Sequence, residues 1–332
     1  MMNKSVNLTF LTIMIMGIIL SVSSNSWFSV WMGMEMNLMA FMPMILQKNN
    51  MLSKESAMTY FMVQAVASML LMVFMITMPS LNFYNMKPIM LMSILMMKSG
   101  ITPFHFWLPK LMEGLNWNMC LILMTIQKIT PMMMMSSLIK MNIFTMMVMI
   151  TSVMVGAIGG LNQTSLRKMM GYSSISNNGW MMAAMMMSEM TWFYYFMIYS
   201  IMTVIMTKTM DNYNIFHMNQ IFMMKEPLIK KMIMMMNMLS ISGLPPFIGF
   251  LPKWIVIQSS LNYMNLTLIA SMVMMTLITI YYYLRVMYST MMITYSEPFW
   301  VNIMSKNSNL LMMYSTLSII GLTMMTMLMW LY

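Results

Sequence analysis

Apolar runs of about 20 residues recur along the whole chain of 332 residues, and this is the length at which an α-helix spans a membrane. Hydrophobic residues make up 60% of the chain, and only 7% are charged, against about 25% in soluble domains. The longest polar stretch, 208–231, is too short for a separate domain. We therefore predict an all-α polytopic membrane protein with no soluble catalytic domain and no nucleotide-binding fold.

The length criterion predicts about eleven transmembrane helices. Their expected ranges are 6–24, 27–46, 56–78, 88–111, 117–138, 142–162, 171–188, 191–208, 230–262, 265–285 and 309–331. The fourth and ninth ranges are longer than one simple helix and contain helix-breaking residues.

These two ranges contain similar motifs. Residues 99–110 read SGITPFHFWLPK, residues 242–253 read SGLPPFIGFLPK, and seven of the twelve aligned positions are identical. Breaks at matching places in two halves are typical of transporters built from inverted repeats, where they mark the working centre. The residues expected to break the two helices are Gly100, Pro103, Gly243, Pro245 and Pro246, with Ser99 and Thr102 beside the first break.

The basic residues predict the orientation. If the N-terminus is placed on side one and the spans alternate, twelve Lys and Arg residues fall on side one, two on side two and three inside spans. This asymmetry indicates that side one faces the matrix or cytoplasm. The two motifs are five spans apart, an odd number, so they run in opposite directions, as an inverted repeat requires. The net charge of +10 is therefore explained by topology and anionic lipid rather than nucleic acid.

Scarce metal ligands exclude several site classes. Cys120 is the only cysteine, which excludes an intrachain disulfide or an iron–sulfur cluster held by this chain alone. The two histidines, His105 and His217, lie far apart in the sequence, so no metal site is predicted. Methionine, with 68 residues, is interpreted as a flexible apolar filler, and its excess fits an AT-rich mitochondrial genome.

Four ionisable residues are the candidate functional groups. A helical rise of 1.5 Å per residue puts Glu35, Lys98 and Lys128 about 12, 15 and 17 Å into a core about 30 Å thick. Lys253 follows the second break. Each buried charge costs about 2.5–3.5 kcal/mol on insertion scales, so charges near one plane indicate proton transfer, with snorkelling or static ion pairs as the alternative. We expect Glu35 to approach Lys98, because a carboxylate partner tunes a lysine's proton affinity.

His105 follows Pro103 at the first break. It either passes protons or caps backbone carbonyls that the break exposes, and the sequence favours neither. Its counterpart in the second motif is Ile248, so the two halves are not chemically equivalent.

The chain resembles a known family in four longer stretches, 24–41, 98–131, 156–180 and 242–258. In these stretches it is similar to the antiporter-like membrane subunits of mitochondrial NADH–ubiquinone oxidoreductase (respiratory complex I), in particular the invertebrate chain 2 family. The resemblance covers nearly the whole chain. By motif, it implies proton-relay roles for Glu35 in the second span, Lys98 before the first break, Lys128 in the fifth span and Lys253 after the second break.

The resemblance also implies the setting. It places the chain in the mitochondrial inner membrane, beside chains 4 and 4L, accessory subunits and lipids including cardiolipin. There the tally of basic residues predicts the N-terminus in the matrix. NADH, FMN, iron–sulfur clusters and ubiquinone are expected elsewhere in the complex, with no cofactor bound by this chain. The predicted parts are a first five-span repeat (1–138), an inverted second repeat (139–290), and a matrix-side loop with a last helix (291–332).

Two other functions stay open from the residues alone. One is a stand-alone proton/cation antiporter of the same fold, and the other is an inert scaffold of the membrane arm. The mid-membrane charges argue against the scaffold, and the mitochondrial composition argues against the antiporter.

Overall fold

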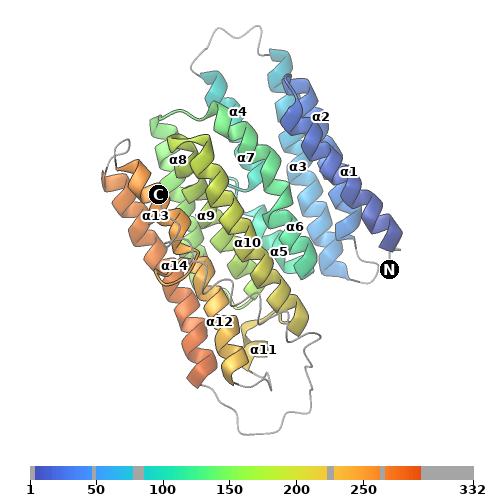
Figure 1. Cartoon of the computed structure of the whole chain (residues 1–332). Coiled ribbons are helices and arrows are strands. Elements are labelled where there is room, and N and C mark those ends of the chain that lie inside the picture. Colours follow the sequence, from blue (N-terminus) through green and yellow to red (C-terminus); the bar gives the residue numbers. More distant parts are fainter. Residues whose placement is uncertain (1–3, 47–49, 78–85, 223–227, 262–265, 293–332) are drawn as a thin grey trace, which may run out of the picture. The chain divides into compact units, whose positions relative to one another are not determined.

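The structure, a computed structural model, describes residues 4–46, 50–77, 86–222, 228–261 and 266–292 (Figure 1). The described part is helical and contains no strand beyond an isolated bridge between Ser165 and His217. The helices are α1 (Lys4–Ser23), α2 (Trp27–Ile45), α3 (Met51–Thr77), α4 (Met86–Ser99), α5 (Trp107–Gly114), α6 (Trp117–Met124), α7 (Ile126–Leu138), α8 (Ile143–Leu161), α9 (Leu166–Met187), α10 (Glu189–Tyr213), α11 (Met218–Phe222), α12 (Leu228–Ser242), α13 (Phe250–Ser260) and α14 (Leu266–Met292).

Within the described residues, six helical segments are long and apolar enough to cross a membrane. They are Ser5–Ser23, Met51–Thr77, Trp117–Leu138, Ile143–Leu161, Glu189–Tyr213 and Leu266–Met292. The all-helical membrane fold predicted from the sequence is therefore confirmed. The predicted span 309–331, and the matrix-side loop before it, lie outside the described residues.

The chain forms two compact units, unit 1 (Met1–Val148) and unit 2 (Met149–Tyr332). In unit 1, α1 packs on α2, α2 on α3, α3 on α4 and α5, and α7 on α4 and α1. The α1–α2 backbones approach closely at two glycines: a Cβ on Gly33 would lie 2.5 Å from the carbonyl oxygen of Gly17. Small residues allow this in membrane helices, where close packing replaces the hydrophobic driving force.

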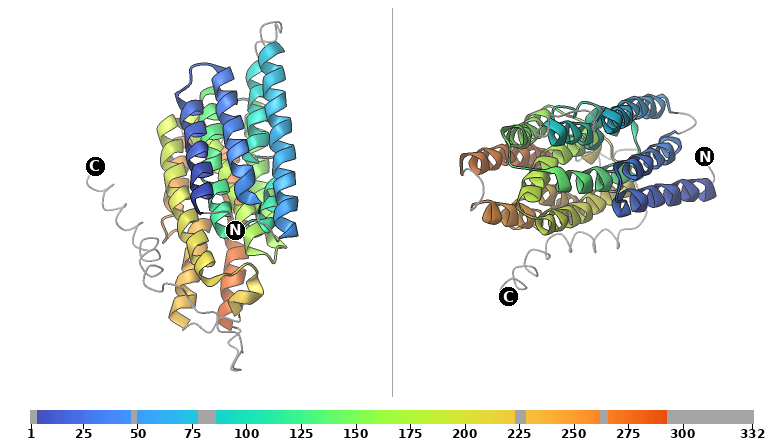
Figure 2. Two further views of the ribbon diagram at one scale, coloured as in Figure 1. Left: turned by 90° about the vertical axis from the view of Figure 1, so that its right-hand side faces the viewer. Right: turned by 90° about the horizontal axis from the view of Figure 1, so that it is seen from above.

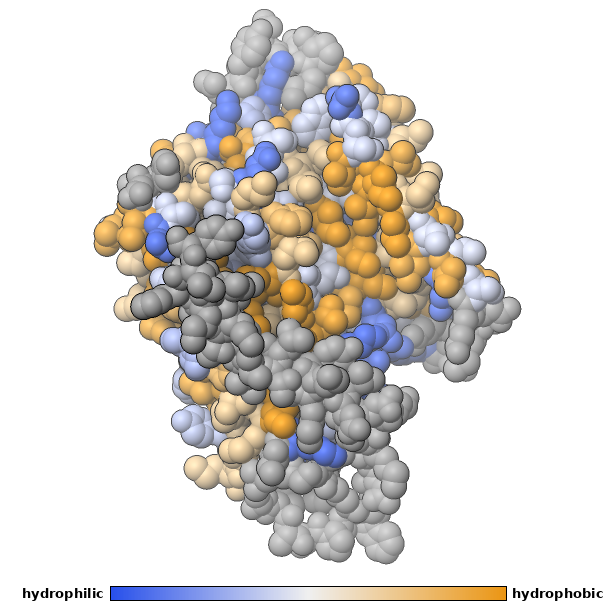
Figure 3. All heavy atoms as spheres, viewed as in Figure 1, coloured by the Kyte–Doolittle hydropathy of each residue, from blue (hydrophilic) through white to orange (hydrophobic). Residues whose placement is uncertain are grey.

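Hydrophobic side chains cover the outer faces of α1, α2 and α3. On the face that Figure 3 shows, where α1 lies in front, hydrophobic residues form a broad area on the right of the view, and hydrophilic residues gather toward the top and bottom. Large exposed examples are Leu8, Met16, Met62, Met69 and Ile76. Such faces are expected against lipid or the apolar helices of neighbouring chains.

In unit 2, α9 is the most enclosed helix and packs on α10 and α13, while α12 packs on α10 and α14. A Cβ at Gly156 would lie 2.6 Å from the backbone nitrogen of Ser176, so α8 and α9 also touch through their backbones. In both views of Figure 2, α12 and α14 lie side by side.

Both motif helices end on a glycine with a left-handed backbone. Gly100 has φ +71° and Gly243 has φ +85°, a conformation that L side chains rarely adopt. The N–H of Ile101 donates to the carbonyl of Met96, and that of Leu244 to the carbonyl of Leu239. These six-to-one bonds are the Schellman arrangement that terminates helices at glycine. The chain resumes as a helix at Trp107 in unit 1 and at Phe250 in unit 2.

A third interruption lies where the sequence predicted an intact span. The helix of residues 117–138 is divided at Thr125, whose φ −112° and ψ −76° depart from helical values. The Thr125 hydroxyl donates to the carbonyl of Leu121, and the N–H of Lys128 donates to the carbonyl of Thr125 at 3.1 Å. Pro131 then removes the N–H that would bond the carbonyl of Gln127. The distortion therefore lies within one helical turn before Gln127 and Lys128.

Candidate functional site

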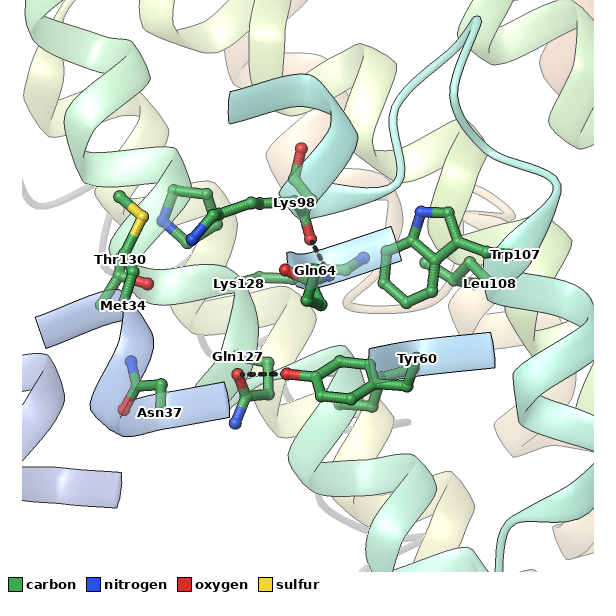
Figure 4. Close-up of a pocket in the computed structure, with 13 residues that line it drawn as sticks. Met34, Asn37, Tyr60, Gln64, Lys98, Trp107, Leu108, Gln127, Lys128 and Thr130 are labelled. Carbon is green, nitrogen blue, oxygen red and sulfur yellow. Dashed lines mark hydrogen bonds between the residues drawn. The ribbon is translucent and has the colours of Figure 1, made fainter. Parts of the chain in front are cut away.

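A polar cavity lies inside unit 1, where two interrupted helices meet α2 and α3 (Figure 4). Its lining comes from α2 to α7 and consists of Met34, Asn37, Tyr60, Gln64, Lys98, Ser99, Trp107, Leu108, Leu123, Gln127, Lys128, Thr130 and Pro131. Two lysines therefore share one cavity. Lys98 is 8% exposed and Lys128 is 2% exposed, so both are withdrawn from the surface of the protein.

Lys98 is the penultimate residue of α4. Because the helix ends at Ser99, the last carbonyls of α4 need donors from outside the helix. The side-chain amide of Gln64, on α3, donates to the carbonyl oxygen of Lys98 at 3.2 Å, and Figure 4 shows this bond. The Ser99 hydroxyl donates to the carbonyl of Leu95 at 3.0 Å. The backbone that carries Lys98 is thus fixed from a neighbouring helix.

Lys128 lies in the first turn of α7, three residues after the distortion at Thr125. Its neighbour Gln127 accepts a hydrogen bond from the Tyr60 hydroxyl at 3.4 Å, and its amide nitrogen lies 3.0 Å from the Met14 sulfur. Gln127 therefore connects α7 to α3 and α1 beside the buried lysine.

Glu35 lies on α2 between Met34 and Asn37, which line the cavity, but is not itself part of the lining. Its carboxylate is within range of Coulombic interaction with Lys98 and Tyr60. The atom Oε1 is buried without a hydrogen-bond partner, and the described residues show no ion pair between Glu35 and Lys98. The structure thus brings Glu35 near Lys98 without forming the direct pair.

In unit 2, Lys253 on α13 is 7% exposed, and its Nζ donates to the carbonyl oxygen of Ser242 at 2.6 Å. The lysine therefore caps the end of α12 across the second break. Its motif counterpart in unit 1 behaves differently: Lys110 is 60% exposed and forms the ion pair with Glu55 at 2.9 Å. The counterpart of Lys98 is Ile241, so each motif places its buried lysine on a different side of the break.

His105 is buried in the segment between α4 and α5, outside the lining of the cavity. Its Nδ1 lies 3.2 Å from the carbonyl oxygen of Pro103, and its ring is 4.1 Å from that of Phe106. The contact with a backbone carbonyl agrees with the capping interpretation. Thr102 in the same segment donates to the carbonyl of Val148 at 3.4 Å. Pro245 and Pro246 lie in the corresponding segment between α12 and α13.

Within the described ranges, no group of three or more His, Cys, Asp or Glu residues could hold a metal ion. Cys120 is a buried free thiol whose Sγ lies 3.8 Å from the carbonyl of Met112.

Comparison with known proteins identifies the family of the chain. Residues 24–279 match the family described as NADH:quinone oxidoreductase/Mrp antiporter, transmembrane. NADH-ubiquinone oxidoreductase chain 2 of Anopheles gambiae is 44% identical, over 98% of this chain and 98% of its own length. The Locusta migratoria protein of the same name is 43% identical, over 96% and 97%. The chain belongs to the NADH-ubiquinone oxidoreductase chain 2 family.

Solved structures show the same fold at much lower identity. A chain of respiratory complex I from Thermus thermophilus superposes with a TM-score of 0.80 at 17% identity, covering 95% of this chain and 78% of that one. A chain of an archaeal membrane-bound sulfane sulfur reductase gives a TM-score of 0.80 at 14% identity, covering 96% and 73%. The chain 2 family thus shares its helical fold with respiratory membrane complexes of distant organisms.

For this member of the chain 2 family, sequence reasoning missed the contribution of α3. Tyr60 and Gln64 are uncharged and stand in an apolar helix, so the search for buried charge passed over them. A signal was present: Ser56, Tyr60, Gln64 and Ser68 recur every four residues, which places polar groups on one helical face. All four are buried.

Proposed function

We propose that the chain is a core membrane subunit of respiratory complex I that translocates protons while quinone is reduced elsewhere in the complex. The observation that carries this proposal is the pair of buried lysines, Lys98 and Lys128, in one polar cavity of an otherwise apolar unit. Ionisable groups at such positions are costly and are kept in membrane proteins mainly for ion or proton movement. Membership of the chain 2 family connects this proton movement to electron transfer from NADH to ubiquinone, which other subunits of the complex carry out.

In the proposed sequence of events, Glu35 modulates the charge state of Lys98, Lys98 exchanges a proton with Lys128 through the cavity, and Lys128 passes it on towards Lys253. The electrostatic influence of Glu35 on Lys98, and the cavity that Lys98 shares with Lys128, support the first two steps. The buried position of Lys253 at its helix break supports a role at the end of the path. His105 is kept as a further candidate at the first break.

The finer fold belongs to the same proposal: eleven spans, with five-span repeats over 1–138 and 139–290 in inverted orientation and a last helix within 291–332. The matching Schellman ends at Gly100 and Gly243 support a common origin of the two halves. The ion pair of Lys110 with Glu55 supports the predicted topology, since it brings the start of α3 and α5 to the same end of unit 1, where the tally of basic residues puts both.

We place the chain in the mitochondrial inner membrane with its N-terminus in the matrix. Its proposed partners are chains 4 and 4L, accessory subunits and lipids such as cardiolipin, which suit the apolar faces of α1 to α3. NADH, FMN, iron–sulfur clusters and ubiquinone are assigned to other subunits. One observation favours the antiporter alternative: the description of the matching family includes Mrp antiporters. Gentle solubilisation separates the two, because an antiporter migrates apart from any large NADH-oxidising assembly.

The decisive experiment replaces Lys128 by Met, which keeps the length of the side chain and removes its charge. We expect normal assembly, because a buried charge is lost and no cavity is created. Proton transfer should fail at this step, so fewer protons are moved per NADH oxidised, or coupled oxidation slows. Vesicles with matched amounts of assembled complex provide the measurement. Unchanged stoichiometry together with an unchanged rate would show that Lys128 is part of a scaffold only.

A further inference from the structure

We propose that Tyr60 and Gln64 of α3 are positioning residues for the two lysines of the cavity, an inference that rests on the proposed function. The residues are four apart, so they lie one above the other on the same helical face. Both are buried, at 3% and 6% exposure, and both line the cavity with Lys98 and Lys128. α3 contributes no charged group to this lining. Its part in the site is therefore to hold groups that other helices carry.

Gln64 holds the end of α4. Its amide donates to the carbonyl oxygen of Lys98, one of the last carbonyls of that helix, which have no donor within the helix itself. In unit 2 a charged group caps the corresponding helix end, because Nζ of Lys253 donates to the carbonyl oxygen of Ser242 at the end of α12. An amide carries no charge that a proton could change. Gln64 therefore keeps the α4 terminus in place in either protonation state of Lys98, while the lysine side chain faces the cavity.

Tyr60 holds the segment around Lys128. Its ring is fixed from two sides, by an edge-on contact with Phe41 of α2 at 5.1 Å and a tilted contact with Trp107 of α5 at 6.2 Å. The fixed ring directs its hydroxyl to Gln127, the residue before Lys128, at 3.4 Å. Figure 4 shows Tyr60 reaching Gln127 below the level of Gln64. The bond is long, so its effect should be smaller than that of Gln64.

The neighbouring polar residues of α3 provide the contrast. The hydroxyl of Ser56 donates to the carbonyl of Ser53, and that of Ser68 to the carbonyl of Ala65. These bonds stay within α3 and do not reach another helix. On the polar face of α3, the two residues that bond to the lysine-bearing helices are thus the two that line the cavity. The two serines only satisfy carbonyls of their own helix.

The test uses the assembled complex in sealed membrane vesicles. Gln64→Met removes the donor at similar volume, Tyr60→Phe removes the hydroxyl and keeps the ring contacts, and Ser68→Ala is the matched control on the same face. Three quantities are measured: assembled complex, protons moved per NADH, and the coupled rate against pH. The pH profile is informative because the ionisable groups at the cavity are Glu35 from α2, Lys98 from α4, Lys128 from α7 and Tyr60 itself.

We expect Gln64→Met to lower the coupled rate by about two- to ten-fold, the range that corresponds to one lost hydrogen bond, and to shift the pH profile. Tyr60→Phe should give about a two-fold loss with a shift in the same profile. Ser68→Ala should match the unaltered protein. A merely structural role would reduce the amount of complex and leave the pH profile of the remaining complex unchanged.

Wild-type stoichiometry, rate and pH profile in both variants would overturn the inference. If only Gln64→Met changes these quantities, Gln64 is a positioning residue and Tyr60 is not. If Gln64→Met does not assemble, Tyr60→Phe decides by the same three readouts. Lys128→Met, measured in parallel, keeps the two proposals distinct: an effect there without an effect at α3 defeats only the positioning role, and no effect at Lys128 defeats the relay.

Discussion

At the scale of single residues, burial decides what a lysine in the repeated motif does. Lys110 and Lys253 occupy the same motif position, yet the first forms an exposed ion pair and the second lies buried against Ser242. Exposed pairs of this kind contribute about 0–1 kcal/mol to stability. A charged donor on a helix C-terminal carbonyl forms a stronger, charge-assisted bond and also meets the negative end of the helix dipole. Lys253 therefore combines a structural cap with an ionisable group.

The two roles of Lys253 can be separated by substitution. Lys253→Gln keeps an N–H donor for the Ser242 carbonyl and removes the charge, whereas Lys253→Met removes both. If Lys253 transfers protons, both variants reduce the protons moved per NADH, and only Lys253→Met also lowers the amount of assembled complex. Lys110→Gln is the control and should behave as the unaltered protein. If Lys253→Gln moves as many protons per NADH as the unaltered protein, Lys253 acts only as a helix cap.

At the scale of elements, the helix breaks depend on glycines at the ends of α4 and α12. The left-handed backbone at Gly100 costs other L-residues about 1–2 kcal/mol. A Cβ there would also lie 2.8 Å from a side-chain carbon of Leu108, and one at Gly243 would lie 2.9 Å from Nζ of Lys253. The breaks are thus supported by backbone conformation and by packing against the returning helix.

Gly100→Ala should therefore destabilise unit 1 by about 1–2 kcal/mol or more, since strain and crowding act together. Thermal inactivation of NADH oxidation in membranes measures the change, and Ser93→Ala in the same helix is the control. Gly243→Ala should additionally displace Lys253 and reduce proton movement. Unaltered thermal stability in Gly100→Ala would mean that the break tolerates a side chain.

The breaks were predictable because glycine and proline carry their conformational preferences in the sequence. The interruption at Thr125 was not, since threonine is common inside helices and the distortion depends on its bond to Leu121 and on Pro131 downstream. Depth along a helix is also readable from a rise of about 1.5 Å per residue, and so Glu35 and Lys98 could be placed near one plane. The directions in which the two side chains point depend on how α2 and α4 pack. Equal depth therefore does not by itself predict a direct ion pair.

The contribution of α3 was hidden for a similar reason. Four-residue spacing of Ser56, Tyr60, Gln64 and Ser68 indicates a common face, but the same pattern serves hydroxyls that bond within their own helix. Only the contacts of Gln64 with Lys98 and of Tyr60 with Gln127 distinguish the two cases. Those contacts arise from helices far apart in the sequence.

At the scale of the whole molecule, the predicted topology can be tested because the sole cysteine is buried. Cys120 is fully enclosed, so a membrane-impermeant maleimide should not label the native chain. Lys110 and Lys140 are exposed and lie beyond opposite ends of the segment Trp117–Leu138, whose 22 residues suffice to cross a bilayer. The tally of basic residues assigns Lys110 to the matrix side and Lys140 to the opposite side.

We therefore expect Lys110→Cys to be labelled in inside-out inner-membrane vesicles and protected in right-side-out mitoplasts, and Lys140→Cys to show the reverse. Loss of the exposed pair of Lys110 with Glu55 costs about 0–1 kcal/mol, so the variant should assemble. The unaltered chain, labelled only after denaturation, is the control for Cys120. Because the two sites are separated by one predicted span, labelling of both from one side would remove that span from the topology. Reversed labelling of both would keep the span and place the N-terminus outside the matrix.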